Sequence, residues 1–462
     1  MDVLLISAGR SSFKGALWGA YDFDLPLNVA YVAAYLEENG YHTEVIDLQL
    51  PSESTAHITT KIDSGRTAFV GVSSNLSSYR EAYRVVNHIR QNDYRGHIFI
   101  FGPLGVFLRN ALFDECPGVD FIVVGEEEPT ILDLVRNVDT PEDVRGICYL
   151  KNGRQKNTPD REYLDDLDLL PFPARHKFRI EEYFPTPGKY YVLPQITVLS
   201  SRGCNYNCLF CGEPGAKRLR GRSAENILLE IDEAVDKYGA REICFVDEMF
   251  GANRDEALKL AEAILRRDYK VFLRISTRVD HVDREVLALL KRAGLYSVGF
   301  GMESGSDRIL RYNNKRITKG QIREAVKLAK SLGLEIRGYF MVNMPGETKK
   351  DIEQTEAFIK ELRLDFVNIQ IAYPYPNTPF RRLAERRYQI VEEKWNRWEF
   401  SDGDDVVFIQ SDLTEDYIAR AYRRIIRSSY LNLRFVAGWC KRIKTFHDFK
   451  YSFLQSVNLV RG

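Results

Sequence analysis

Three cysteines stand close together in segment 204–211, directly after a predicted β-strand. Thiolates hold iron–sulfur clusters, and four of them complete the shell of a [4Fe-4S] cluster. Three thiolates at C-x3-C-x2-C spacing leave one iron open to bind a small molecule, as one coordination position stays open in catalytic metal centres. The segment therefore predicts a [4Fe-4S] cluster held by Cys204, Cys208 and Cys211.

A structural zinc site is the alternative for the same residues. It would need a fourth Cys or His nearby, and the next thiol, Cys244, falls in the middle of a predicted core strand. Seven cysteines in 462 residues, three of them clustered, indicate metal ligation in a reducing compartment rather than a disulfide framework.

The cysteine motif, with Phe210 before its last cysteine and Arg202-Gly203 before its first, resembles the signature of the radical S-adenosylmethionine (SAM) superfamily. The resemblance implies that SAM binds the open iron. Reduction of the cluster would then cleave SAM to methionine and a 5'-deoxyadenosyl radical. It also implies an electron donor such as a flavodoxin or ferredoxin, which nothing in the sequence identifies.

The resemblance assigns further residues to SAM. It places Phe210 beside the cofactor, Asp247 and Glu248 at the SAM amino group, and Glu303-Ser304 in a "GxESG" turn near the ribose or methionyl end. Arg278 and Arg337 are weaker candidates for the SAM carboxylate. A loop-end cap is the alternative for the acids, and a structural ion pair is the alternative for each arginine.

Two later segments resemble turns of one branch of the superfamily. Segment 345–348 matches "PGET", and segment 373–379 matches "YPxPGT" except that Asn377 replaces the usual Gly. Asn tolerates left-handed backbone geometry, so we expect this turn to survive. Tyr206, Tyr373 and Tyr375 could contact adenine or relay hydrogen atoms, with ordinary packing as the alternative.

The elements around these motifs alternate between strand and helix signals. Six strand candidates cover 195–200, 242–246, 271–276, 297–300, 335–341 and 366–372. A helix over 224–238 is expected to begin after Ser223 and to end at Gly239. Residues 195–385 thus predict a partial (β/α)6 TIM-type barrel, in which acids at the strands' carboxyl ends face the mouth.

The first 140 residues show a second alternating pattern, that of a Rossmann-like, flavodoxin-type parallel sheet. Strands are expected over 3–7, 43–47, 69–74, 97–102 and 121–124, and helices over 27–39 and 78–90. Ligands bind outside the carboxyl ends of the strands in such sheets. The candidate binding residues at these ends are Ser7, Ser73, Ser74, Gly102, Gly125 and Glu126.

Segments 26–47 and 124–130 resemble the cobalamin-binding domain of cobalamin-dependent radical SAM proteins, which implies cobalamin as a further cofactor. The D-x-H-x-x-G motif, whose His ligates cobalt in many cobalamin proteins, is absent; radical SAM members commonly lack it. A Rossmann-like domain without a cofactor is the alternative.

The remaining parts connect or extend these two domains. Residues 141–194 are predicted to form a linker with a hairpin at 147–153. Residues 386–462 are predicted to form a helical C-terminal region that caps the barrel or binds substrate. Residues 418–444 form a basic amphipathic stretch. It could cap the barrel, the favoured interpretation, or contact an anionic substrate or a membrane surface.

The domain order favours cobalamin-dependent methyl transfer to an unactivated carbon of a small-molecule or lipid substrate. Radical cyclisation or rearrangement, as in anaerobic magnesium-protoporphyrin cyclases, is the alternative. A methylthiotransferase is disfavoured because its second cluster would need three further cysteines before the triad, and only Cys116 and Cys148 precede it. A non-enzymatic cobalamin- or metal-binding protein would leave the barrel-mouth acids unexplained.

The composition sets outer bounds on location and partners. With 65 basic and 65 acidic residues, the chain shows no global bias toward nucleic acid, so no nucleic-acid partner is expected. The N-terminus is a predicted strand rather than a signal peptide, and no apolar run approaches the roughly 20 residues that span a bilayer. A cytoplasmic protein is expected.

Overall fold

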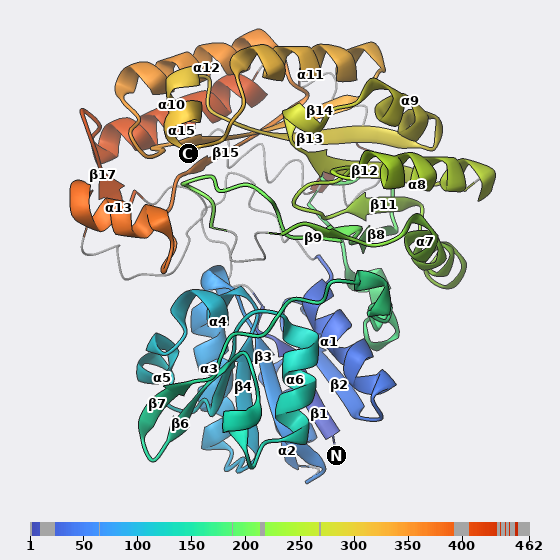
Figure 1. Ribbon diagram of the computed structural model, residues 1–462, viewed down its shortest axis with the longest axis vertical. Coiled ribbons are helices and arrows are strands. Elements are labelled where there is room, and N and C mark those ends of the chain that lie inside the picture. The colour runs from blue at the N-terminus through green and yellow to red at the C-terminus, as the bar shows by residue number, and fades with distance from the viewer. Residues whose placement is uncertain are drawn as a thin grey trace. The chain divides into compact units, whose positions relative to one another are not determined.

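The computed structural model describes residues 2–9, 24–63, 65–186, 188–212, 218–267, 269–391, 406–431 and the positions 435, 439, 443, 449 and 450. These residues divide into two compact units that meet in the sequence at residues 183 and 184. Each unit contains one large sheet (Figure 1).

The first unit holds a seven-stranded sheet in the order β2-β1-β3-β4-β5-β6-β7. Its first five strands pair in parallel and are β1 (Asp2–Ser7), β2 (His42–Asp47), β3 (Thr67–Ser73), β4 (His97–Phe101) and β5 (Phe121–Val123). All five were predicted from their apolar runs. Their side chains are largely buried, as expected for a parallel sheet covered on both faces.

Helices of the first unit connect these strands. They are α1 (Leu27–Glu38), α2 (Thr55–Asp63), α3 (Tyr79–Gln91), α4 (Pro103–Leu108), α5 (Ala111–Glu115) and α6 (Glu127–Arg136). The sequence predicted α1, which is apolar and buried over most of its surface, and α3, which has one clear apolar face. The short helices α4 and α5 are too brief for a periodic pattern to reveal them.

Part of the segment predicted as a linker pairs with the first sheet. The expected hairpin is present as β6 (Ile147–Lys151) and β7 (Arg154–Asn157), but β6 pairs antiparallel with β5 and so extends the first sheet. Residues 147–157 therefore belong to the first unit. Main-chain pairing with β5 decided this, and no local pattern reports it.

The second unit holds a six-stranded, fully parallel sheet in the order β15-β14-β13-β12-β11-β8, the architecture expected of a partial barrel. Its strands are β8 (Gln195–Val198), β11 (Glu242–Phe245), β12 (Phe272–Thr277), β13 (Leu295–Glu303), β14 (Glu335–Val342) and β15 (Phe366–Ile371). All six lie where the sequence predicted them.

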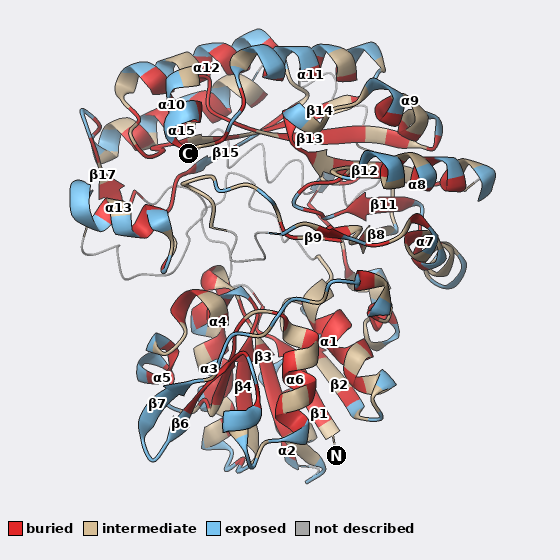
Figure 2. Ribbon diagram, in the orientation of Figure 1, coloured by how far each residue is buried: buried red, intermediate tan, exposed pale blue. Residues whose placement is uncertain are grey.

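Helices of the second unit pack along one face of this sheet (Figure 1). They are α7 (Ala224–Tyr238), α8 (Arg254–Arg267), α9 (Arg284–Arg292), α10 (Asp307–Tyr312), α11 (Lys319–Ser331) and α12 (Lys349–Leu362). Helix α7 begins and ends as predicted: Ser223 Oγ accepts from Asn226 N, and Gly239 is left-handed. Figure 2 shows buried strands beneath helices with exposed outer faces.

The C-terminal part contributes α13 (Pro379–Arg387), the short strands β16 (Gln389–Ile390) and β17 (Phe408–Ile409), and α15 (Glu415–Tyr430). Helix α15 contacts β15 and α12 and buries Ile418, Tyr422 and Ile426. Helix α15 thus covers the sheet at β15. Most of the predicted basic stretch beyond residue 431 lies outside the described residues. Among the described residues, no helix is long and apolar enough to cross a membrane.

Candidate active site at the carboxyl end of the second sheet

The cysteine loop lies between the two short paired strands β9 (Ser201–Arg202) and β10 (Arg220–Gly221). Cys204, Cys208 and Cys211 are half-buried. Leu209 N donates to Asn313 O at 2.9 Å, and Asn314 Nδ2 donates to Asn207 O at 2.9 Å. The turn after α10 therefore holds the loop through its main chain.

Arg278, which follows β12, contacts the loop through an aromatic ring. Its guanidinium carbon lies 3.5 Å from the centroid of the Tyr206 ring, a cation–π contact. Arg278 also pairs with Asp280 at 2.9 Å and donates to Lys315 O at 2.7 Å. The Tyr206 hydroxyl lies 2.8 Å from His281 Nε2. These contacts fix the segment between the first two cysteines.

Glu303 ends β13 with a backbone φ of +63°, a left-handed conformation that is uncommon for a residue other than glycine. Lys315 Nζ donates to Glu303 Oε1 at 2.7 Å, and both side chains are largely buried. Backbone strain of this kind persists where surrounding contacts impose it, often at functional sites. The acid of the predicted "GxESG" turn is thus held by a lysine that the sequence did not single out.

The charges of Lys315 and Arg278 also act on Cys208. Burial raises the pKa of the Cys208 thiol, whereas these two cations oppose the rise. Lys315 Nζ lies 5.9 Å from the centroid of the Phe210 ring. Cations beside a thiol favour its thiolate form, the form that binds metal. The donor set and its surroundings fit an iron–sulfur cluster.

No group of three His, Cys, Asp or Glu side chains in the described ranges is arranged to hold a single metal ion, and this includes the three cysteines. A [4Fe-4S] cluster differs from a single ion because each cysteine binds a different iron.

Asp247 follows β11 and holds the start of the cysteine loop. Its Oδ1 accepts from Ser200 N, Ser200 Oγ and Ser201 Oγ at 2.7 to 2.9 Å. Its Oδ2 is buried without a partner among the described residues. Burial raises the pKa of Asp247 to about 6. An unpaired buried carboxylate oxygen fits a ligand donor such as the SAM ammonium. Its neighbour Glu248 is exposed.

The structure does not bring Arg337 together with the other candidates. Arg337 lies near the amino end of β14, where it pairs with Glu335 at 2.8 Å and donates to Ser297 Oγ. The loop contacts described above lie beyond the carboxyl ends of the strands. The observed contacts are those of the structural ion pair, the alternative that the sequence left open.

Ser304 is fully buried, and its hydroxyl is used within the protein. It lies 3.2 Å from Thr355 Oγ1 on α12 and accepts from Ser306 N. These bonds hold the turn that carries Glu303.

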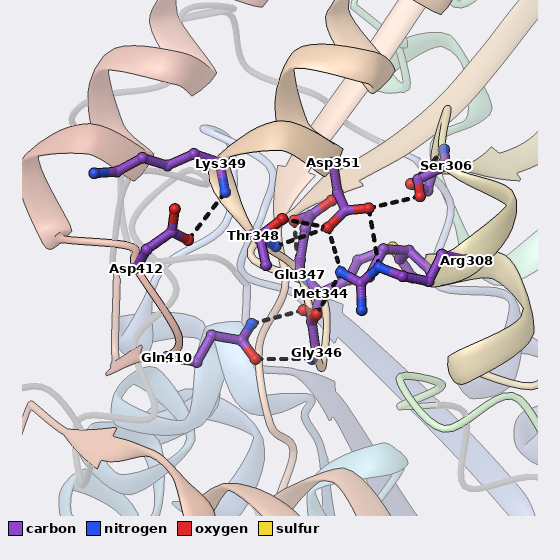
Figure 3. A network of polar contacts seen from close by, with 12 residues as sticks. Ser306, Arg308, Met344, Gly346, Glu347, Thr348, Lys349, Asp351, Gln410 and Asp412 are labelled. Carbon is purple, nitrogen blue, oxygen red and sulfur yellow. Dashed lines mark hydrogen bonds and ion pairs between the residues drawn. The ribbon is translucent and has the colours of Figure 1, made fainter.

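The "PGET" turn after β14 forms a further polar network (Figure 3). Asp351 accepts from Thr348 and Ser306 and pairs with Arg308, while Gln410 Nε2 donates to Met344 O at 2.6 Å. Asn313 Nδ2 donates to Pro345 O at 2.9 Å. Since the Asn313 carbonyl also accepts from the cysteine loop, Asn313 joins the two turns.

The second branch-specific turn survives as predicted, because Asn377 adopts a left-handed conformation with φ of +60°. Of the two tyrosines before it, Tyr375 lies directly against the cysteine loop: a Cβ on Gly212 would fall 2.2 Å from the Tyr375 ring. The rings of Tyr373 and Tyr375 make an edge contact at 5.6 Å.

In the first unit, the predicted binding residues gather at the carboxyl ends of the parallel strands. Ser7 ends β1, Ser73 ends β3, and Gly102 and Gly125 follow β4 and β5 with φ of +92° and +94°. A Cβ on Gly125 would meet no atom of the described residues within 4 Å, so these residues leave the main chain uncovered there. The open main chain at Gly125 lies at the edge where sheets of this type bind their ligands and fits the approach of a large cofactor.

Two other predicted residues of this edge are already bonded. Ser74 Oγ lies 2.9 Å from Ser78 Oγ, and Glu126 Oε2 accepts from Leu164 N at 3.2 Å. Asn28 was not predicted, yet its amide donates to Ser73 Oγ at 2.9 Å and to Glu127 Oε2.

A three-cysteine loop at the mouth of a parallel partial barrel, accompanied by a flavodoxin-type unit, defines a cluster-dependent barrel enzyme with a second cofactor domain. The family models agree: that of the Radical SAM superfamily matches residues 198–359, and that of the B12 binding domain matches residues 23–135. The chain belongs to the radical SAM superfamily and carries a B12-binding domain. Its cofactors are a [4Fe-4S] cluster, SAM and cobalamin.

Similar proteins place the chain more closely. It is 30% identical over 414 residues to an uncharacterized methyltransferase of Pyrococcus horikoshii, covering 88% of both chains. It is 28% identical to the anaerobic magnesium-protoporphyrin IX monomethyl ester cyclase of Rubrivivax gelatinosus, over 80% of this chain and 68% of the cyclase. These relatives confirm the predicted family.

The fold is shared with the cobalamin-dependent SAM radical enzyme OxsB, solved with aqua-cobalamin and SAM bound. The TM-score is 0.74 at 18% identity, over 99% of this chain and 71% of OxsB. The predicted architecture is confirmed.

Sequence reasoning missed Lys315, Asn313 and Asn28. Each is a polar residue that is buried or half-buried and that bonds a predicted site residue or its loop. A polar residue inside an otherwise apolar pattern is a weak local signal, and its partners lie far away in the sequence.

Proposed function

We propose that the chain is a cobalamin-dependent radical SAM methyltransferase whose cluster is held by Cys204, Cys208 and Cys211. One observation carries the proposal: the loop of these cysteines lies against two cations and an acid, Arg278, Lys315 and Glu303, beyond the carboxyl ends of β12 and β13. Catalytic groups of βα barrels gather at this end.

Each candidate side chain has its own proposed role in binding SAM or in holding the cysteine loop. Glu303, oriented by Lys315, offers its second carboxylate oxygen to a hydroxyl or ammonium group of SAM. Asp247 offers its unpaired Oδ2 to the SAM ammonium, and Phe210 packs beside the cofactor. Arg278 serves chiefly to fix the loop through Tyr206, because Asp280 and Lys315 O already occupy its guanidinium.

The first unit is proposed to hold cobalamin over the strand ends that carry Ser7, Ser73, Gly102 and Gly125. Ser74 and Glu126 support this edge through the bonds described above. When bound, the cluster with SAM supplies a hydrogen-abstracting radical and cobalamin supplies a transferable methyl group. We further propose that this unit extends to residue 183, past the domain limit expected from the sequence, while the barrel keeps the expected limits of 195–385.

Methyl transfer is favoured over cyclisation because the relative that covers 88% of this chain is named a methyltransferase. A relative from Streptomyces wedmorensis, cytidylyl-2-hydroxyethylphosphonate methyltransferase, covers 86% of this chain at 24% identity. The cyclase relatives keep cyclisation as the second candidate.

The proposed enzyme acts on a small molecule and needs an external one-electron donor, a flavodoxin or ferredoxin. The capping role of α15 uses its apolar face, so any membrane contact would fall to its basic face. Arg424 on that helix pairs with Glu356 of α12, and Arg420 pairs with Asp416. These pairs support capping over membrane binding for residues 415–430.

Anaerobic reconstitution with iron, sulfide and hydroxocobalamin, followed by desalting, tests the proposal. We expect the optical and EPR signals of one [4Fe-4S] cluster, retained cobalamin, and reductive release of 5'-deoxyadenosine. S-adenosylhomocysteine formed alongside would report methyl transfer.

Cys208→Ala should abolish the cluster and SAM cleavage, whereas Cys148→Ala, which removes a buried thiol of the first unit, should not. A wild-type protein without a cluster would refute the proposal. A cluster that cleaves SAM without retained cobalamin would refute its cobalamin part.

A further inference from the structure

The two faces of the second sheet differ in chemistry. Side chains that alternate along β12, β13 and β14 toward the helices are apolar and buried, such as Ile275, Val298 and Phe340. The opposite face carries Phe272, Met341 and Phe366, but most of its residues are polar or small, and several are half-buried or exposed: Arg274, Ser276, Gly299, Tyr339, Asn368 and Gln370. A barrel interior that only packs would be filled by bulky branched residues instead.

Strand register places these polar residues side by side. In the register of the sheet, Arg274 stands opposite Cys244 of β11, and Ser276 stands opposite Gly299 of β13. Tyr339 stands opposite Asn368 of β15. A Cβ on Gly299 would fall 2.8 Å from Ser276 Oγ and 3.1 Å from the Tyr339 hydroxyl oxygen. Two hydroxyls thus border a spot without a side chain, in the same face as Arg274.

Arg274 is under-used as a hydrogen-bond donor. A guanidinium has five N–H groups, yet Arg274 makes one hydrogen bond among the described residues, from Nη2 to Cys244 Sγ at 2.8 Å. Its Nε is buried without a partner. Arg337 on the same face, in contrast, is paired with Glu335.

No carboxylate in the described ranges forms an ion pair with Arg274. The acid whose charge acts on it, Glu242, already accepts from Gln195, Tyr296 and the main-chain N–H groups of Tyr191 and Val192. A buried donor without an acceptor costs about 1–3 kcal/mol, more for a charged group. An acceptor that arrives with a ligand removes this cost.

We propose that Arg274, with the hydroxyls of Ser276 and Tyr339, binds an anionic group of the substrate, a carboxylate or a phosphate-type group. This inference rests on the proposed function and names its substrate class as polar anionic small molecules. Guanidinium forks match both anions in geometry. The polar face disfavours the hydrocarbon chain of a lipid in this part of the barrel.

The strand also fixes how far the anion lies from the cysteine loop. Arg274 lies in β12 and precedes Arg278, the extended residue directly after this strand, by four residues, or about 13 Å at 3.3 Å per residue. The substrate is therefore elongated, with its anionic end toward the barrel floor and its reacting carbon nearer the mouth.

Calorimetric titration of the reconstituted full chain with inorganic phosphate, pyrophosphate and succinate tests the site. We expect saturable one-site binding of at least one anion; the preferred anion separates phosphate from carboxylate chemistry. Arg274→Gln should weaken this binding at least tenfold, Arg274→Lys and Tyr339→Phe by less, while the exposed control Arg323→Gln should bind as the wild type does.

Two results would overturn the inference: wild-type protein that binds none of the three anions, or Arg274→Gln protein that binds as tightly as wild type. Iron content and melting temperature report whether Arg274→Gln folds. If it does not, undiminished binding by both Arg274→Lys and Tyr339→Phe overturns the inference instead. The titration involves no SAM turnover, so the anion site and the proposed enzymatic function can fail independently.

Discussion

Lys315 Nζ lies 2.7 Å from Glu303 Oε1, and this pair joins the turn after α10 to the end of β13 beside the cysteine loop. The side chains are 8% and 12% exposed, so solvent screens the pair little. Glu303 also carries the left-handed backbone of its turn. The lysine thus sets both the orientation of the acid and the charge near Cys208.

Lys315→Met should therefore leave a buried carboxylate without its partner. Breaking a buried pair from one side costs about 3–5 kcal/mol, so we expect a loss of this order in urea-induced unfolding. SAM binding to the reconstituted protein, measured by calorimetry, should weaken as well. Lys315→Arg should retain part of both, and the exposed Lys327→Met should change neither. If Lys315→Met had the same free energy of unfolding as the wild type, the Lys315–Glu303 pair would not stabilise the fold.

Substitutions of Tyr206 can distinguish the contribution of its ring from that of its hydroxyl to holding the cysteine loop. Its ring covers the Arg278 guanidinium and its hydroxyl bonds His281. Tyr206→Phe keeps the ring, so we expect nearly wild-type iron content after reconstitution and desalting. Tyr206→Leu loses the cation–π contact, worth about 0.5–2 kcal/mol, and should retain severalfold less cluster in air. Equal cluster retention by the two variants would argue against the ring as an anchor.

Glu347 should make stability depend on pH. Burial raises the pKa of Glu347 to about 8, far above its ordinary value near 4. The folded state then holds a proton that the unfolded chain releases, so the free energy of unfolding should fall as pH rises from about 4 to 8, by a few kcal/mol. Glu347→Gln should remove this part of the slope in urea unfolding at pH 5 and pH 8. The exposed control Glu353→Gln should keep it, and an unchanged slope in Glu347→Gln would contradict the assignment.

Tyr430 should matter because it closes the edge of the second sheet. Its hydroxyl accepts from Val367 N at 3.2 Å and donates to Val367 O, in the edge strand β15. Tyr430→Phe leaves both buried main-chain groups unpaired, at about 1–3 kcal/mol each and so roughly 2–6 kcal/mol together. Urea unfolding should show a loss in that range. Tyr41→Phe, whose hydroxyl has no partner in the described part of the chain, is the matched control; equal losses would refute the edge role.

The chemistry and most of the secondary-structure elements could be predicted from the sequence. Ligand spacing is a local property, so the C-x3-C-x2-C segment predicted the family that the relatives confirm. Periodicity is local too, and it placed all eleven predicted parallel strands correctly. The left-handed Asn377 was expected because it stands at the usual Gly of the "YPxPGT" turn and Asn tolerates this conformation.

The contacts between polar groups could not be predicted, because they depend on how distant segments pack. The pairing of β5 with β6 turned a predicted linker into strands of the first sheet, because hydrogen bonds between distant segments leave no local pattern. Lys315 lies twelve residues from Glu303, and Arg274 lies thirty from Cys244. Arg278 and Arg337 looked alike in sequence, yet strand position puts one at the cysteine loop and the other at the opposite end of the sheet. Burial and partner geometry, which give these side chains their roles, exist only once the chain has folded.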